Sequence, residues 1–247
     1  MLTVFLVGVL LGSYVQSVTG FAMAMILIAV ASGSQTVEIP VAAAVVSLLS
    51  LANAVLALVG QHQHIERRLF VWLAVGQLPA IWVGVALLDV LHGDARWLLE
   101  IALGAFIVLG SLSMMIRPEP RETLSRPLGC VGAGVAGGLV GGLFSASGPI
   151  MGWFNYRQPH EVSAIRATLL AGFVLTTSTR SVVVGVQGGL TSEVWLLTAL
   201  AMPLVVFGTW AGKAFRPPLS EAGMKRLAFA VLLGMGVWIL VRAALSV

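Results

Sequence analysis

The chain has 247 residues, of which 58% are hydrophobic and 10% are charged, and its formal net charge is +4. An ordinary soluble domain is roughly 45–50% apolar and about 25% charged, so this composition excludes a water-soluble fold. The basic excess comes from arginines scattered in short loops and not from a basic domain, which argues against nucleic-acid binding.

Long apolar segments follow one another along the chain. Each has about 20 residues or more and is bounded by polar or charged residues, which is the pattern of bilayer-spanning helices. In chain order they cover residues 2–32, 37–60, 69–91, 96–116, 128–155, 162–187, 190–212 and 224–245. The sequence therefore predicts an all-α, polytopic membrane protein.

These segments fall into two halves. A stretch rich in proline and charge, residues 117–127, divides them four and four. Two short patterns recur at equivalent places in the halves. They are Ser-x-Ser/Thr-Gly-x-x-Met, at 17–23 and 145–151, and Pro-x-x-x-x-Gly, at 79–84 and 203–208. We predict two transmembrane repeats, residues 1–120 and 126–247.

The charges distinguish two topologies. If every segment crosses the membrane once, the lysines and arginines outside it divide 6 against 7 and indicate no orientation. If the first segment of each half is instead a re-entrant hairpin of two half-helices, they divide 11 against 2, with only Arg96 and Arg242 on the poorer side. That division is a clear positive-inside signal. It predicts inverted repeats of one hairpin and three transmembrane helices, with both termini outside the cytoplasm. The alternative is eight simple transmembrane helices.

The glycine-rich breaks resemble those of a known family. Residues 134–149 read Gly-Val-Ala-Gly-Gly-Leu-Val-Gly-Gly-Leu-Phe-Ser-Ala-Ser-Gly-Pro, and 12–20 form the weaker equivalent. With the duplicated Pro-x-x-x-x-Gly segments, they resemble the TauE/SafE family over nearly the whole chain. The resemblance implies a bacterial inner (plasma) membrane protein that exports sulfite and organosulfonates such as sulfoacetate. Many members have consecutive glycines where this chain has Ser145-Ala-Ser-Gly148, which leaves another small organic anion open as the substrate.

An oxyanion that crosses a bilayer must exchange its hydration shell for fixed donors, because an uncompensated charge in hydrocarbon costs several kcal/mol. Helix N-termini supply such donors, since their first N–H groups lack intrahelical partners and the macrodipole places about half a positive charge there. We expect the second half-helices to begin near Gly20 and Gly148 and to meet at the membrane midplane. The hydroxyls expected to bind the anion, or merely to cap their own helices, are those of Ser17, Thr19, Ser145 and Ser147.

Other polar residues inside apolar segments are also candidates. Arg180 is the one cation well inside a segment, and its depth fits either snorkelling to the outer interface or contact with an anion. Gln16, Asn53 and Gln77 lie near the centres of their segments, where they would line a cavity or, more often, bridge helices. The candidate substrate-binding residues are therefore Gln16, Ser17, Thr19, Gly20, Asn53, Gln77, Ser145, Ser147, Gly148 and Arg180.

We predict no enzyme, because the sequence has neither His-Glu-x-x-His nor paired membrane aspartates. Gly-x-x-x-x-Gly-Lys-Ser/Thr is also absent from it, so a gradient-driven, secondary transporter is the default. A passive anion channel is the alternative, because opposed hairpins could line a pore. We expect no metal or other cofactor. The sequence leaves open the coupling ion, proton or sodium, and assembly as a homodimer.

Overall fold

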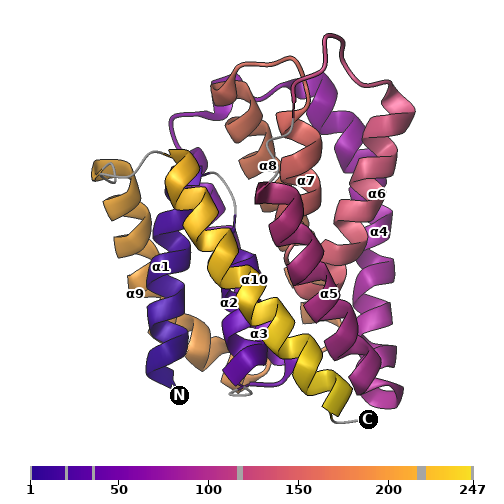
Figure 1. The fold of residues 1–247 in the computed structure, drawn as a ribbon, viewed down its shortest axis with the longest axis vertical. Coiled ribbons are helices and arrows are strands. Elements are labelled where there is room, and N and C mark those ends of the chain that lie inside the picture. The colour runs from indigo at the N-terminus through magenta and orange to yellow at the C-terminus, as the bar shows by residue number, and fades with distance from the viewer. Residues whose placement is uncertain (1, 20–21, 35–36, 116–118, 216–220, 246–247) are drawn as a thin grey trace.

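The computed structural model describes residues 2–19, 22–34, 37–115, 119–215 and 221–245. Within these ranges all the regular structure is helical (Figure 1). The helices are α1 (Leu2–Thr19), α2 (Met23–Ser34), α3 (Ile39–Leu58), the 3₁₀ turn η1 (His62–His64), α4 (Arg67–Asp94), α5 (Arg96–Met115), α6 (Pro127–Phe144), α7 (Gly148–Tyr156), α8 (Val162–Val186), α9 (Ser192–Ala214) and α10 (Glu221–Leu245).

Two of the predicted segments are broken. Segment 2–32 contains α1 and α2, and segment 128–155 contains α6 and α7, so the alternative of eight simple helices is wrong. Each break holds a residue with a left-handed backbone that is not glycine: Ala22 has φ 100° and Ser145 has φ 58°. Residues with a Cβ rarely adopt these angles, and here they stand where the chain reverses direction.

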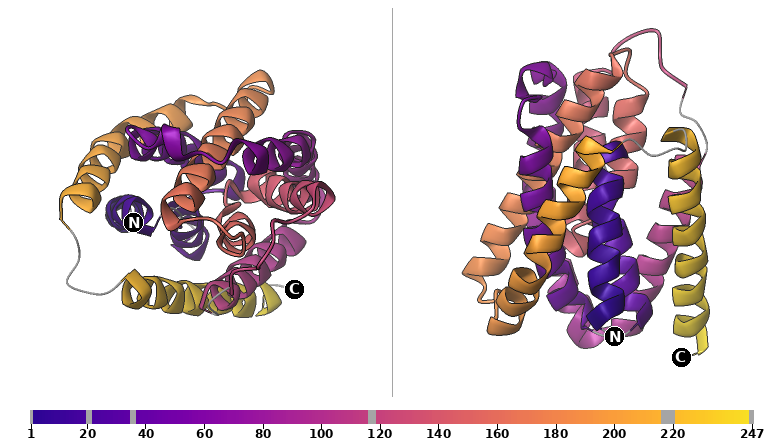
Figure 2. Two further views of the ribbon diagram at one scale, coloured as in Figure 1. Left: turned by 90° about the horizontal axis from the view of Figure 1, so that it is seen from above. Right: turned by 90° about the vertical axis from the view of Figure 1, so that its left-hand side faces the viewer.

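The two hairpins open at opposite ends of the bundle (Figure 1 and Figure 2). We call the end where α1 begins and α10 ends the terminal end, and the other the linker end. At the terminal end, Arg242 near the end of α10 donates a 3.1 Å hydrogen bond to the carbonyl oxygen of Ser32 in α2. At the linker end, the N–H of Arg121 donates to the carbonyl oxygen of Arg157, just after α7, at 2.9 Å.

Glycines let α4 and α6 pack backbone against backbone. A Cβ added at Gly138 of α6 would lie 2.6 Å from the carbonyl oxygen of Gln77 in α4. The glycines of this interface are Gly76 and Gly84 on α4 and Gly134, Gly138 and Gly142 on α6. Small residues repeated every four positions allow this close approach in membrane helices. The glycine-rich run is thus a packing surface, and the break follows it.

The pairing of α1 with α9 uses the same device. A Cβ at Gly208 of α9 would lie 2.8 Å from the carbonyl oxygen of Leu10, and one at Gly212 would lie 2.9 Å from that of Tyr14. The long arm of each hairpin, α1 or α6, is therefore held closely by a long helix from elsewhere in the chain.

The outer surface is apolar. Six described helices, α3, α4, α5, α6, α8 and α9, are long and apolar enough to cross a membrane, and shorter apolar stretches cover 3–18, 23–33 and 232–245. Large side chains such as Trp82, Trp210 and Trp238 are more than half exposed. Such a surface would associate in water, whereas in a bilayer it faces lipid. The chain is a polytopic membrane protein.

Candidate functional site

The break between α6 and α7 buries two serines. Ser145 follows α6 in the left-handed conformation and Ser147 precedes α7, which begins at Gly148 as predicted. Each serine is only 3% exposed. Ser147 occupies the N-cap position, but its hydroxyl makes no capping hydrogen bond. Its hydroxyl is thus not committed to the bond that N-cap serines usually make.

The first break lies slightly later than predicted. Helix α1 continues through Thr19, and α2 begins at Met23. Ser17 lies in the last turn of α1 and donates to a carbonyl oxygen of its own helix at 2.9 Å, so Ser17 does not cap the second half-helix. Instead, Oε1 of Gln16 accepts the N–H of Met23 at 3.1 Å. The side chain of Thr19, and Gly20, lie outside the described residues.

A small cavity lies where the two breaks meet. Its walls come from both hairpins and from α3 and α8. They consist of Gln16, Ala22, Ala24, Met25, Ser50, Ser145, Ser147, Gly148, Phe173 and Thr177. The volume open to the centre of a water molecule is about 20 Å³, which is room for about one water.

Two hydrogen-bonding groups in the cavity wall are buried without a partner among the described atoms. They are the Nε2 of Gln16 and the hydroxyl of Ser50. A buried polar group without a partner costs about 1–3 kcal/mol. These two groups are therefore free to donate to a ligand that accepts hydrogen bonds.

Arg180 is completely buried beside this wall. Its Nε donates to the carbonyl oxygen of Gly142 at 2.8 Å, and its Nη1 donates to the carbonyl oxygen of Ala43 and to the hydroxyl of Ser47, both at 2.9 Å. Its Nη2 has no partner, and no carboxylate of the described residues forms an ion pair with it. Snorkelling to the outer interface is wrong, since the side chain is 0% exposed.

A chain of hydroxyls links Arg180 to the cavity. The hydroxyls of Ser47 and Ser145 lie 2.8 Å apart. Ser47 already donates to the carbonyl oxygen of Ala43 and accepts from Arg180. Because that assignment uses the single hydroxyl hydrogen of Ser47, it leaves Ser145, which lines the cavity, as the donor between the two serines.

Three predicted residues lie away from the cavity. Nδ2 of Asn53 donates to Oγ1 of Thr209 at 2.7 Å, and Nε2 of Gln77 donates to Oγ1 of Thr176 at 2.8 Å. Both amides therefore bridge helices, which was the expected alternative to lining a cavity. Ser17 faces Gly212 of α9.

Ser50 was missed as a site residue, and so was Ser47. A signal for them exists, because Ser47, Ser50 and Asn53 recur at intervals of three in an otherwise apolar segment. Residues three apart lie on one face of a helix, so the spacing marks a polar stripe on α3. Phe173 and Thr177 of α8 line the same cavity without a comparable signal.

Comparison with known proteins decides the family. The model of the sulfite exporter TauE/SafE family matches residues 4–239. The chain belongs to this family. A protein of Cupriavidus necator described as a probable sulfite/organosulfonate exporter TauE is 40% identical over 232 residues, which cover 94% of this chain and 91% of the relative. No solved structure matches the chain.

Membership of the TauE/SafE family confirms the resemblance found in the glycine-rich break. The protein is a multi-pass protein of the bacterial inner membrane and not an enzyme. Membership of the family supports the interpretation of the chain as an anion exporter.

Proposed function

We propose that the chain is a secondary transporter that exports small sulfur-containing anions, such as sulfite or organosulfonates like sulfoacetate, and binds them between the two hairpin breaks. The cavity at the breaks carries the proposal, because buried donors of Gln16 and Ser50 lack partners there. The oxygens of a sulfur oxyanion accept several hydrogen bonds, and bonds to a charged acceptor are the strong ones.

Positive potential at the cavity supports an anionic ligand. Gly148, the first residue of α7, lines the wall, so the positive end of that helix dipole faces the space. Arg180 is connected to the wall by hydrogen bonds, since it donates to the hydroxyl of Ser47, which lies 2.8 Å from the hydroxyl of Ser145. Arg180 has no carboxylate partner in the described structure, so an anion in the cavity would compensate a buried charge that is otherwise unpaired.

Matched helix contacts support inverted repeats over residues 1–120 and 126–247. Under such repeats, each of α1–α5 corresponds to the helix numbered five higher. The contact of α4 with α6 then corresponds to that of α9 with α1, and the contact of α3 with α9 to that of α8 with α4. The contacts of α5 with α10 and of α3 with α8 correspond to themselves. The hairpins also open at opposite ends of the bundle (Figure 1), as an inverted repeat requires.

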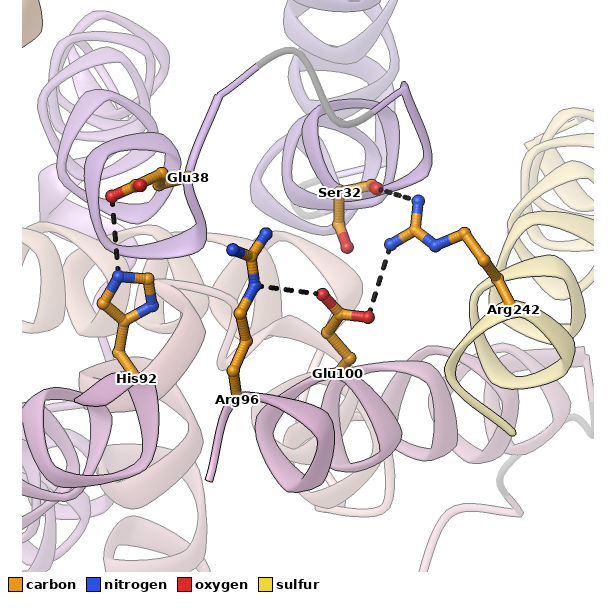
Figure 3. Close-up of polar contacts among 6 residues, drawn as sticks. All are labelled: Ser32, Glu38, His92, Arg96, Glu100 and Arg242. Carbon is orange, nitrogen blue, oxygen red and sulfur yellow. Dashed lines mark hydrogen bonds and ion pairs between the residues drawn. The ribbon is translucent and has the colours of Figure 1, made fainter. Parts of the chain in front are cut away.

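In the proposed orientation, the linker end faces the cytoplasm. Arg67, Arg121 and Arg157 gather there, next to the loops that join the helices. Arg96 and Arg242 lie together at the terminal end (Figure 3). This separation follows the positive-inside rule.

The small size of the cavity favours a carrier over a passive channel. A space of about 20 Å³ is too small for a sulfur oxyanion with its oxygens, so an anion could pass the breaks only after the helices rearrange. Such rearrangement is what a carrier undergoes between its two open arrangements. We therefore propose alternating access around the hairpin breaks, driven by a proton or sodium gradient.

The test is transport by purified protein in liposomes. Uptake of sulfite and of sulfoacetate would be followed under an imposed proton gradient and, separately, a sodium gradient, with sulfate as a control anion and empty liposomes as blank. We expect saturable uptake of a sulfur oxyanion that one of the two gradients accelerates.

Other outcomes assign other functions. Uptake that does not saturate, and follows only the membrane potential, would indicate a passive anion channel. If the protein remains monodisperse and transports none of the tested anions, the proposed substrate class is refuted. Cross-linking of the reconstituted protein would show whether it assembles as a homodimer.

A further inference from the structure

A second cavity, lined mainly by polar and charged residues, lies at the terminal end, away from the hairpin breaks. Its volume is about 350 Å³, and its walls consist of Ser32, Val37, Glu38, Ile39, Arg96, Glu100, Glu193 and Arg242. Arg96 and Arg242 are the only two cations that the predicted topology leaves on this side of the membrane. Both of them line this one cavity (Figure 3).

The carboxylate of Glu100 holds the two arginines together. Its Oε1 lies 3.3 Å from Nε of Arg96, and its Oε2 lies 3.5 Å from Nη2 of Arg242. Glu100 is only 7% exposed. Arg242 also holds the carbonyl oxygen of Ser32. Two guanidinium groups from α5 and α10 thus converge on one oxyanion beside the end of α2.

A further donor points at the same place. The hydroxyl of Ser32 is buried without a partner and points toward the space between Arg96 and Glu100 (Figure 3). Guanidinium groups bind carboxylates and other oxyanions with the same N–H groups. The donors now used by Glu100, together with this hydroxyl, would therefore suit a sulfite or sulfonate group equally well.

We propose that this cavity is a second oxyanion site, at which the exported anion takes the place of the Glu100 carboxylate on Arg96 and Arg242. The proposal rests on the proposed function, since it places the site on the outward path. The two cavities share α2, because Met25 lines the central one and Ser32 the outer one. At 1.5 Å per residue, Met25 and Ser32 lie about 10 Å apart along that helix.

The other charged groups keep the outer site weak. Glu38 and Glu193 also line it, and Glu38 lies 3.5 Å from Nε2 of His92. With three carboxylates against two guanidinium groups, an anion binds only while Glu100 moves aside. A site on an exit path must release its ion readily. Return of Glu100 to the arginines would expel the anion outward.

The test measures access of an anion to the site and not transport. Full-length protein in lipid nanodiscs carries Cys130→Ala, which removes the only native thiol, and Ser32→Cys as a reporter. The labelling rate with sulfonatoethyl methanethiosulfonate, an anion, is divided by the rate with the neutral methyl reagent. Glu100→Gln should raise this ratio about fivefold, the factor for removing one unit charge about 4 Å away in water.

Three controls sharpen the result. Glu122→Gln, an exposed acid at the linker end, should leave the ratio unchanged. Adding Arg96→Gln and Arg242→Gln to Glu100→Gln should bring the ratio back down. Sulfoacetate should slow the anionic labelling in the Glu100→Gln protein and lose this effect when the arginines are replaced. Where Arg242→Gln protein does not fold, Arg96→Gln alone provides the comparison.

A ratio unmoved by Glu100→Gln, or protection by sulfoacetate that persists without the arginines, would overturn the outer site. The readout also separates the two proposals. Normal flux with labelling independent of the arginines refutes only the outer site. Arginine-dependent labelling in a protein that moves no anion upholds the outer site and refutes the proposed transport.

Discussion

Nη1 of Arg180 lies 2.9 Å from the hydroxyl oxygen of Ser47, and this contact joins α8 to α3 at the level of the second break. The same guanidinium holds the carbonyl oxygen of Gly142 in the last turn of α6. The carbonyl groups of a last turn lack intrahelical partners, so Arg180 satisfies one of them. One buried cation thereby positions the end of the helix that leads into the cavity.

Arg180→Gln should lower sulfite flux by about tenfold or more, because a neutral amide replaces the buried positive charge nearest to the cavity. Flux in liposomes is measured at equal amounts of folded protein. Arg180→Lys should recover part of the flux, since it keeps the charge but not the fork of N–H groups. Arg67→Gln, an exposed cation at the linker end, is the control. Normal flux in well-folded Arg180→Gln protein would remove this residue from the site.

Ser50→Ala and Ser147→Ala should each raise the KM for the anion about fivefold, the effect of losing about 1 kcal/mol of hydrogen bonding. Both hydroxyls line the central cavity without a capping role. Ser17→Ala is the matched control, because Ser17 bonds to its own helix and does not line the cavity. Concentration dependence of the initial rate provides the measurement. Equal KM values for the three variants and the wild type would refute a hydroxyl-lined site.

Gly138→Ala should destabilise the protein by about 1–3 kcal/mol, because its Cβ would lie 2.6 Å from the carbonyl oxygen of Gln77. Gly132→Ala on the same helix meets open space and should be neutral, or stabilising by up to about 1 kcal/mol through helix propensity. Apparent melting temperatures in detergent, read from tryptophan fluorescence, compare the two. Equal melting temperatures would contradict the close contact of α4 and α6.

Ser145→Val should lower the apparent melting temperature by about 2–4 °C or more, the shift for roughly 1 kcal/mol in a chain of this size. A β-branched residue at φ 58° is strained. Ser145→Gly should stay closer to the wild type, because glycine adopts this angle freely and offsets the lost bond to Ser47. A valine variant as stable as the glycine variant would show that the left-handed turn does not limit stability.

Much of the fold could be predicted because apolar length and charge patterns are local. The Ser-x-Ser/Thr-Gly pattern placed the start of α7 correctly at Gly148. It placed the first break too early, because Ser17 bonds back to its own helix, α1 continues to Thr19 and α2 begins only at Met23. The glycines before the second break were expected to interrupt a helix. They instead form a surface for α4, and this depends on a partner far away in sequence.

The candidate site was harder to predict because its polar contacts join distant helices. The depth of Arg180 could be estimated from its position in the segment, but its partners on α3 and α6 could not. Serine is common in membrane helices, and Ser50 becomes a candidate site residue only because residues of the two hairpin breaks line the same cavity. Glu100 and Arg242 lie 3.5 Å apart, yet they are 142 positions apart in the sequence, which is more than half of the chain.

The glycine contacts also bear on how such a chain could arise. The long arm of each hairpin has its close backbone partner in the opposite half, α1 with α9 and α6 with α4. A half-length protein with this design would leave both the arm and the partner helix without a surface to pack on. Two copies in opposite orientations could close the bundle by exchanging these arms. With the proposed inverted repeats, the single chain would have the architecture of an antiparallel dimer fused into one polypeptide.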